Sequence, residues 1–183
     1  VCERAFASWQ HGRKRDHNQD INWLSLETQH SLNEFAVLAF SISYELDYFN
    51  VVQILKACDI PLLAKDRDDR YPLLIAGGPP VTANPEPLAP IFDYFAIGEA
   101  EVILPSLVDI LVEKVQDSRL SLLEALSRLP GIYTPNFGIQ EITKRQWVQN
   151  IDAFPTVSTV LTPNTEFGEL YLMEISRGCN RGC

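Results

Sequence analysis

The sequence is poor in glycine and cysteine, with 9 and 4 among 183 residues, and it carries 15 basic against 24 acidic side chains. Scarce glycine excludes a collagen-like repeat, and 46% hydrophobic residues are too many for a disordered chain. No apolar run approaches the roughly 20 residues that cross a bilayer, so no membrane contact is predicted. The net charge of −9 repels phosphates and argues against a nucleic-acid-binding surface.

The few cysteines also bear on the compartment. Four are too sparse for a disulfide scaffold, so we expect reduced thiols and a cytoplasmic protein. No basic stretch followed by an apolar one opens the chain, so no export signal is predicted. Because the chain begins at Val1 and stops at Cys183 inside a motif, we interpret it as a fragment of a longer protein.

Three short apolar runs, at residues 35–42, 73–76 and 93–97, are typical of strands buried on both faces of a sheet. Amphipathic helical patterns follow the first and the third run, ending near Cys58 and Gln116, and Ser43 is a candidate N-cap for the first helix. This alternation predicts an α/β fold with a doubly wound parallel sheet.

In such sheets, ligands bind beyond the carboxyl ends of the strands. The residues that we expect at this edge, and predict to contact a cofactor, are Ser41, Gly77, Gly78, Gly98 and Glu99. The glycine pair would let a nucleotide tail approach the backbone closely, and a tight turn is the alternative reading. Glu99 begins a helix, where a carboxylate is also favoured by the helix dipole. No catalytic residue is predicted in this chain.

The pattern changes after residue 118. A short helix at 121–129 and short strand candidates at 132–133, 139–143 and 157–161, separated by proline and glycine, predict a linking module over residues 119–163. A further strand at 170–176 then runs directly into a glycine-bearing loop. We therefore expect three parts: an α/β domain at 1–118, the linking module, and the start of another domain at 164–183.

The terminal loop holds Cys179 and Cys183 in C-x3-C spacing. A glycine-bearing loop is flexible enough to wrap two thiolates around one metal centre, so both cysteines are predicted metal ligands. A zinc half-site, a redox dithiol and an adventitious pair are the alternatives.

The sequence around these cysteines, EISRGCNRGC at residues 174–183, resembles the start of the radical S-adenosylmethionine (SAM) signature CxxxCxxC. The third cysteine would come three positions after Cys183. The resemblance implies a 4Fe–4S cluster on the thiolates, with SAM chelated by the open iron and cleaved reductively to a 5′-deoxyadenosyl radical. It also implies an electron donor such as flavodoxin or ferredoxin, and it leaves the substrate unidentified.

The upstream motifs LLIAGGPP (73–80), NPEP (84–87) and DYFAIGEAE (93–101) resemble the Rossmann-like, cobalamin-binding-like domain that precedes many radical SAM barrels. If the chain starts at the second strand of that domain, its first strand and helix lie before Val1. Residues 164–183 would then begin the partial (β/α) barrel. The alternatives are a binding module that recognises a substrate or partner without a cofactor, and a small zinc or redox dithiol protein.

Cobalamin itself is a separate question, because domains that displace its lower base use a histidine in a DxHxxG loop. His11, His17 and His30 all lack the aspartate two positions before and the glycine three positions after. We therefore expect the chain not to bind cobalamin tightly. Titration with hydroxocobalamin should leave its visible spectrum unshifted, and sub-micromolar binding with a shifted spectrum would refute the expectation.

Overall fold

The computed structural model describes residues 1–6, 23–114, 116–135, 137, 142–166 and 168–178. Its centre is a sheet with the strand order β1-β2-β3-β4. β1 (Val37–Ser41), β2 (Leu73–Gly77) and β3 (Tyr94–Ala96) are parallel, and β4 (Ile132–Tyr133) pairs antiparallel with β3. The three predicted parallel strands are thus confirmed, but the sheet as a whole is mixed. Burial on both faces holds for β2 and β3 and is wrong for β1, an edge strand in which only Leu38 is buried while Ala39 and Ser41 are exposed.

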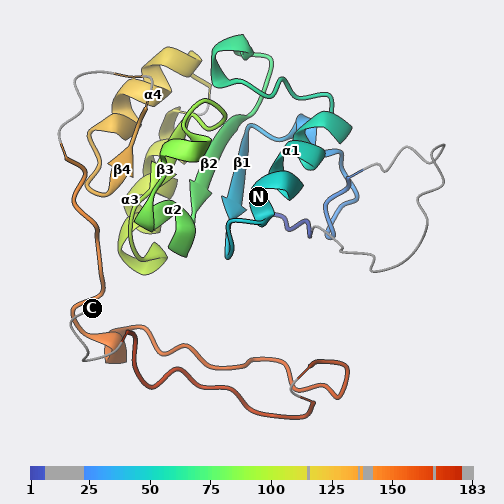
Figure 1. Ribbon diagram of the computed structural model, residues 1–183, viewed down its shortest axis with the longest axis vertical. Helices are drawn as coiled ribbons and strands as arrows, with labels where there is room; N and C mark the ends of the chain where they lie inside the picture. The colour runs from blue at the N-terminus through green and yellow to red at the C-terminus, as the bar shows by residue number, and fades with distance from the viewer. Residues whose placement is uncertain (7–22, 115, 136, 138–141, 167, 179–183) are drawn as a thin grey trace. The chain divides into compact units, whose positions relative to one another are not determined.

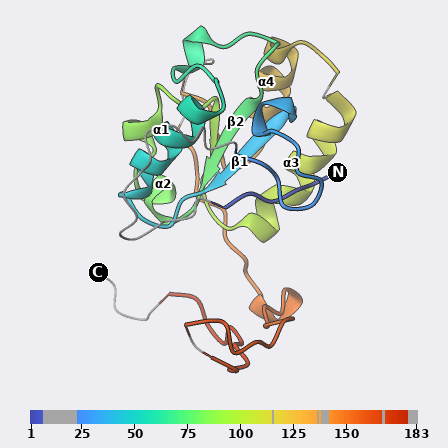
Figure 2. The same ribbon diagram turned by 90° about the vertical axis from the view of Figure 1, so that its right-hand side faces the viewer.

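Helices cover both faces of the sheet. α1 (Asp47–Ala57) and α2 (Pro79–Ala83) lie on one face, and α3 (Ala100–Lys114) and α4 (Arg119–Ser127) lie on the other (Figures 1 and 2). Short 3-10 turns occur at Leu32–Glu34, Ala64–Asp66, Glu86–Leu88 and Ile151–Ala153. This three-layer arrangement agrees with the predicted α/β class. Within the described residues, no helix has the length and apolar character needed to span a membrane.

The alternating side chains of the strands divide the core between the two faces. On the α1 side, Leu74 and Phe95 pack with Val51 and Leu55. On the α3 side, Leu73 and Tyr94 pack with a second set of buried residues, namely Ile75, Ile103, Leu107, Leu122, Leu126 and Ile132. Because successive residues point to opposite faces, a continuous apolar run such as 73–76 supplies both layers at once.

The start of α1 differs from its sequence prediction. The helix begins at Asp47, and the residue before it makes no side-chain cap, so Ser43 does not cap it. The Asp47 carboxylate instead accepts a hydrogen bond from the Tyr44 backbone N–H at 3.3 Å. The first N–H groups of the helix bond instead to carbonyls of the preceding turn, Asp47 to Tyr44 at 3.0 Å and Tyr48 to Glu45 at 3.2 Å.

The structure divides the chain into two compact units, Val1–Gln146 and Trp147–Cys183, whereas the sequence placed divisions near residues 118 and 163. The first unit extends further because α4 and β4 belong to it: Leu122, Leu126 and Ile132 are buried beside Tyr94. The composition change after residue 118 does not reveal this packing, because the apolar side chains that complete the core lie in short elements.

The second unit contains an extended pairing rather than the strands predicted at 157–161 and 170–176. Ser158 donates its backbone N–H to the Leu172 carbonyl at 2.8 Å, and Glu174 donates to Thr156 at 2.9 Å. Val157 and Met173 form an antiparallel bridge. The apolar side chains here remain exposed, among them Leu170 at 60% and Ile175 at 80%. A two-stranded pairing without a covered face has little independent stability.

A buried cluster of charges lies at the amino end of β3. The Asp93 carboxylate accepts hydrogen bonds from the Leu74 backbone N–H at 2.7 Å, from Arg119 at 2.5 Å and from Arg67 at 3.3 Å. The side chains of Asp93 and Arg67 are 4% and 0% exposed. Arg67 also donates to the carbonyls of Pro61, Leu62 and Ile91. Burial lowers the pKa of Arg67, and Asp93 opposes that effect.

We expect Asp93→Asn to destabilise the first unit by about 3 kcal/mol, because it leaves two buried guanidinium groups without their anion. Urea unfolding followed by circular dichroism measures the loss. Asp68→Asn is the control: Asp68 pairs with Arg70 at 2.7 Å on the surface, where solvent screens the pair, so the unfolding midpoint should barely move. Equal midpoints for the two variants would contradict the assignment.

Candidate functional site

The predicted cofactor residues all lie at the carboxyl edge of the parallel strands. Ser41 ends β1 and is exposed, and it pairs in register with Gly77, the last residue of β2. Gly78 opens α2, while Gly98 and Glu99 lie between β3 and α3. The arrowheads of β1 and β2 in Figure 1 mark this edge. The structure therefore brings the five residues to one edge, and a contact between them and a cofactor stays a prediction.

Gly78 has a structural reason to be glycine. Its φ is +117°, a conformation that side-chain-bearing residues rarely adopt, and a Cβ built there would lie 2.0 Å from the Ile42 carbonyl oxygen. The backbone that follows β1 therefore occupies the space above Gly78. The neighbouring Gly77 differs, because its Cβ would meet Ala96 at an ordinary 3.7 Å. The tight-turn reading accounts for Gly78 without any ligand.

Gly98 is shaped by a segment that the sequence did not single out. Its φ is +132°, and a Cβ there would lie 2.1 Å from the Gln146 carbonyl oxygen. Gln146 pairs with this loop as a short parallel bridge, donating to Ile97 at 3.0 Å and accepting from Glu99 at 2.9 Å. A Cβ at Gly131 would meet the Gln146 side chain at 2.6 Å. Gly98 and Gly131, both at positive φ, thus leave the space that Gln146 occupies. We call this contact between the two glycines and Gln146 the Gln146 seat.

The Glu99 side chain points toward this exit segment rather than into open solvent. Its carboxylate lies 3.8 Å from the Arg145 guanidinium, and it is 18% exposed against 58% for Arg145. A long, solvent-screened ion pair of this kind adds little stability. The carboxyl end of β3 is therefore covered by residues 145–146, and the ends of β1 and β2 carry the exposed part of the predicted site.

The predicted metal ligands Cys179 and Cys183 lie outside the described residues. Just before them, Arg177 donates two hydrogen bonds to the Glu174 carboxylate, at 2.7 and 2.9 Å. These hydrogen bonds lower the pKa of Glu174. Within the described part of the chain, no group of three or more His, Cys, Asp or Glu side chains is placed to hold a metal ion. Cys58 is buried among apolar residues, and burial raises the pKa of its thiol.

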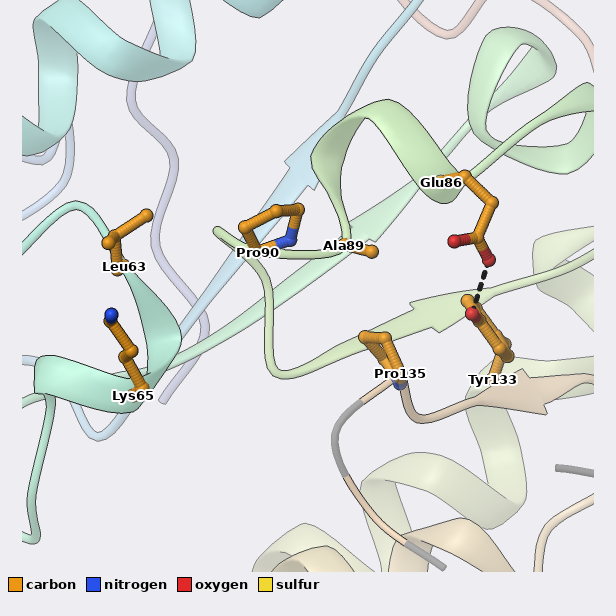
Figure 3. A pocket seen from close by; sticks show the side chains of 7 residues that line it. All are labelled: Leu63, Lys65, Glu86, Ala89, Pro90, Tyr133 and Pro135. Atoms are coloured by element: carbon orange, nitrogen blue, oxygen red, sulfur yellow. Dashed lines mark hydrogen bonds between the residues drawn. The ribbon is translucent and has the colours of Figure 1, made fainter. Parts of the chain in front are cut away.

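A hollow of about 500 Å³ lies away from the predicted edge. Lys65 and Pro90 precede β2 and β3, and Pro135 follows the antiparallel β4, so these lining residues lie toward the amino ends of the parallel strands. Figure 3 shows the Tyr133 hydroxyl donating a hydrogen bond to Glu86 across its wall. The hollow contains none of the predicted residues, and ligand binding at the carboxyl edge stays a prediction from the topology of the sheet.

The fold and this edge define a Rossmann-like α/β protein. Residues 1–135 match the family model described as "Radical SAM proteins, N-terminal", and the chain belongs to this family of radical SAM proteins. It is also 29% identical over 174 residues to an uncharacterized protein, MJ0966, of Methanocaldococcus jannaschii, which covers 92% of this chain. The chain spans 33% of that relative's length. No solved structure matches the chain.

We expect Gly78→Ala to cost on the order of 3 kcal/mol, because it combines backbone strain at positive φ with overlap against Ile42. Gly77→Ala is the matched control, since it adds the same methyl group at the adjacent position in ordinary contact with Ala96. Thermal unfolding of both variants measures the difference. Comparable melting temperatures would show that Gly78 is not required by the packing described above.

Proposed function

We propose that this chain is the N-terminal part of a radical SAM iron–sulfur enzyme. Membership of the radical SAM N-terminal family over residues 1–135 is the observation that carries the proposal. The motif at residues 174–183 supports it, as does the relative whose length is about three times the matched part. Residues 164–183 would begin the catalytic barrel, and the α/β unit would stand before it.

Cys179 and Cys183 would supply two of the three thiolates that hold a 4Fe–4S cluster. The donor chemistry fits, because thiolates on a glycine-bearing loop are the usual ligands of such clusters. When bound, the cluster supplies one electron for the reductive cleavage of SAM. The Arg177–Glu174 pair would fix the residues that lead into the loop, since a bidentate guanidinium–carboxylate contact holds both side chains in one geometry.

The partners follow from this chemistry. SAM is the small-molecule partner, and a low-potential protein such as flavodoxin or ferredoxin would deliver the electron. The histidines of this chain do not support cobalamin binding with a displaced lower base, because none has the DxHxxG spacing. A reducing, cytoplasmic compartment would suit an oxygen-sensitive cluster and free thiols.

The test is anaerobic iron–sulfide reconstitution of the full-length protein, followed by iron analysis and electron paramagnetic resonance of the reduced sample. We expect a 4Fe–4S signal that Cys179→Ala and Cys183→Ala each abolish, since the cluster loses a required thiolate. Cys2→Ala is the control, because Cys2 is exposed and lies far from the motif in sequence. Reduced wild-type protein should also convert SAM to 5′-deoxyadenosine.

Two results would contradict the proposal. A cluster retained in both motif variants would mean that these cysteines are not its ligands. Stoichiometric zinc without iron, bound through Cys179 and Cys183, would favour the zinc reading of the same pair.

A further inference from the structure

Three large apolar side chains gather where β1 passes into α1. Tyr44, Leu46 and Phe49 are 70%, 76% and 69% exposed, and we call them the α1 rim. Leu46 and Phe49 are three residues apart and so share one side of the helix start, and Tyr44 lies in the turn before it. Single exposed apolar residues are common, whereas a group of three within six residues is a candidate interaction surface.

The rim is not needed to build the helix. Asp47 organises the turn by accepting the Tyr44 N–H at 3.3 Å and the Asn50 side-chain amide at 3.2 Å. The opposite side of α1 supplies the core, through Val51, Ile54 and Leu55. Local capping and burial therefore account for the helix without the three exposed side chains, and their apolar character needs a separate cause.

The rim stands at the edge from which the chain leaves this unit. Tyr44 follows the carboxyl end of β1, and the Gln146 seat lies at the carboxyl end of β3 in the same sheet. Gln146 is the last residue of the first unit, so the polypeptide that continues toward the cysteine motif starts from this edge. This chain covers 33% of the length of the relative from Methanocaldococcus jannaschii. About two thirds of that relative therefore lies outside the matched part.

We propose that the α1 rim is the docking surface for the polypeptide that follows Cys183 in the full-length protein. The inference rests on the proposed function, which makes this chain the N-terminal part of a longer enzyme. A second copy is disfavoured, because Glu45 lies among the rim residues and the chain carries a net charge of −9, so two rims would repel one another. The docking face should be apolar, with a lysine or arginine opposite Glu45.

Site-specific photo-crosslinking of the full-length protein tests this. Benzoylphenylalanine replaces Phe49, an aromatic substitution at an exposed position, and the control places it at Leu120 of α4, a separate apolar side chain that is 64% exposed. We expect a crosslink within one chain from position 49 to residues beyond Cys183, and none to that region from position 120. A crosslink between two chains, or to residues 1–146 alone, would overturn the proposal.

Hydrogen exchange supplies a second measurement that needs no variant. The amides of residues 47–50 should exchange more slowly in the full-length protein than in the chain of residues 1–183, and those of α4 should not change. Equal rates at 47–50 would overturn the docking. Full-length protein that binds the cluster but shows neither effect rejects the docking alone. A crosslink from position 49 in a protein that binds no 4Fe–4S cluster through Cys179 and Cys183 rejects the proposed function alone. A gene that ends at Cys183 rejects both proposals.

Discussion

The Asp93 carboxylate joins three segments that are distant in sequence, and the arrangement of the first unit depends on it. It binds the Leu74 N–H of β2, Arg67 in the turn before β2, and Arg119 at the start of α4. A buried carboxylate without its cations is costly, so the Asp93 charge is compensated only when the fold brings Arg67 and Arg119 to it. The cluster thus couples the sheet to the layer that α3 and α4 form.

With the amino end held in this way, the opposite edge can carry loops shaped by close backbone contact. Ile42 fits against Gly78, and Gln146 fits against Gly98 and Gly131. Ser41 and the α1 rim are among the described residues that stay exposed at the carboxyl edge. One edge therefore combines the residues predicted to meet a cofactor, the exit of the chain and an uncovered apolar surface. That combination is what an N-terminal domain needs if it works against a second domain of the same polypeptide.

Family membership and the structure contribute different parts of this account. The match over residues 1–135 assigns the chain to the radical SAM proteins, and the described residues provide the α/β unit that precedes the cysteine motif. In the described part of residues 157–175, apolar side chains such as Leu161, Leu170 and Ile175 remain exposed beside the antiparallel Val157–Met173 bridge. An extended segment of this kind is stabilised when further strands pair with it, which agrees with its proposed place at the start of a barrel.

The sequence by itself determined the class of the fold, because short apolar runs at 35–42, 73–76 and 93–97 alternate with amphipathic helical patterns, as strands and helices do in a layered α/β fold. It did not show that the first run forms an edge strand, on which Ala39 and Ser41 stay exposed. It also determined the family, through motifs that lie close together along the chain. Tertiary structure decided the rest. Arg67 lies in a polar turn and Arg119 begins α4, and their common partner, Asp93, is known only once the strands are in register. The role of Gln146 likewise appears only from its contact with Gly98. Local patterns report burial and turn chemistry, whereas a charge pair or a backbone seat is defined by which distant segments meet.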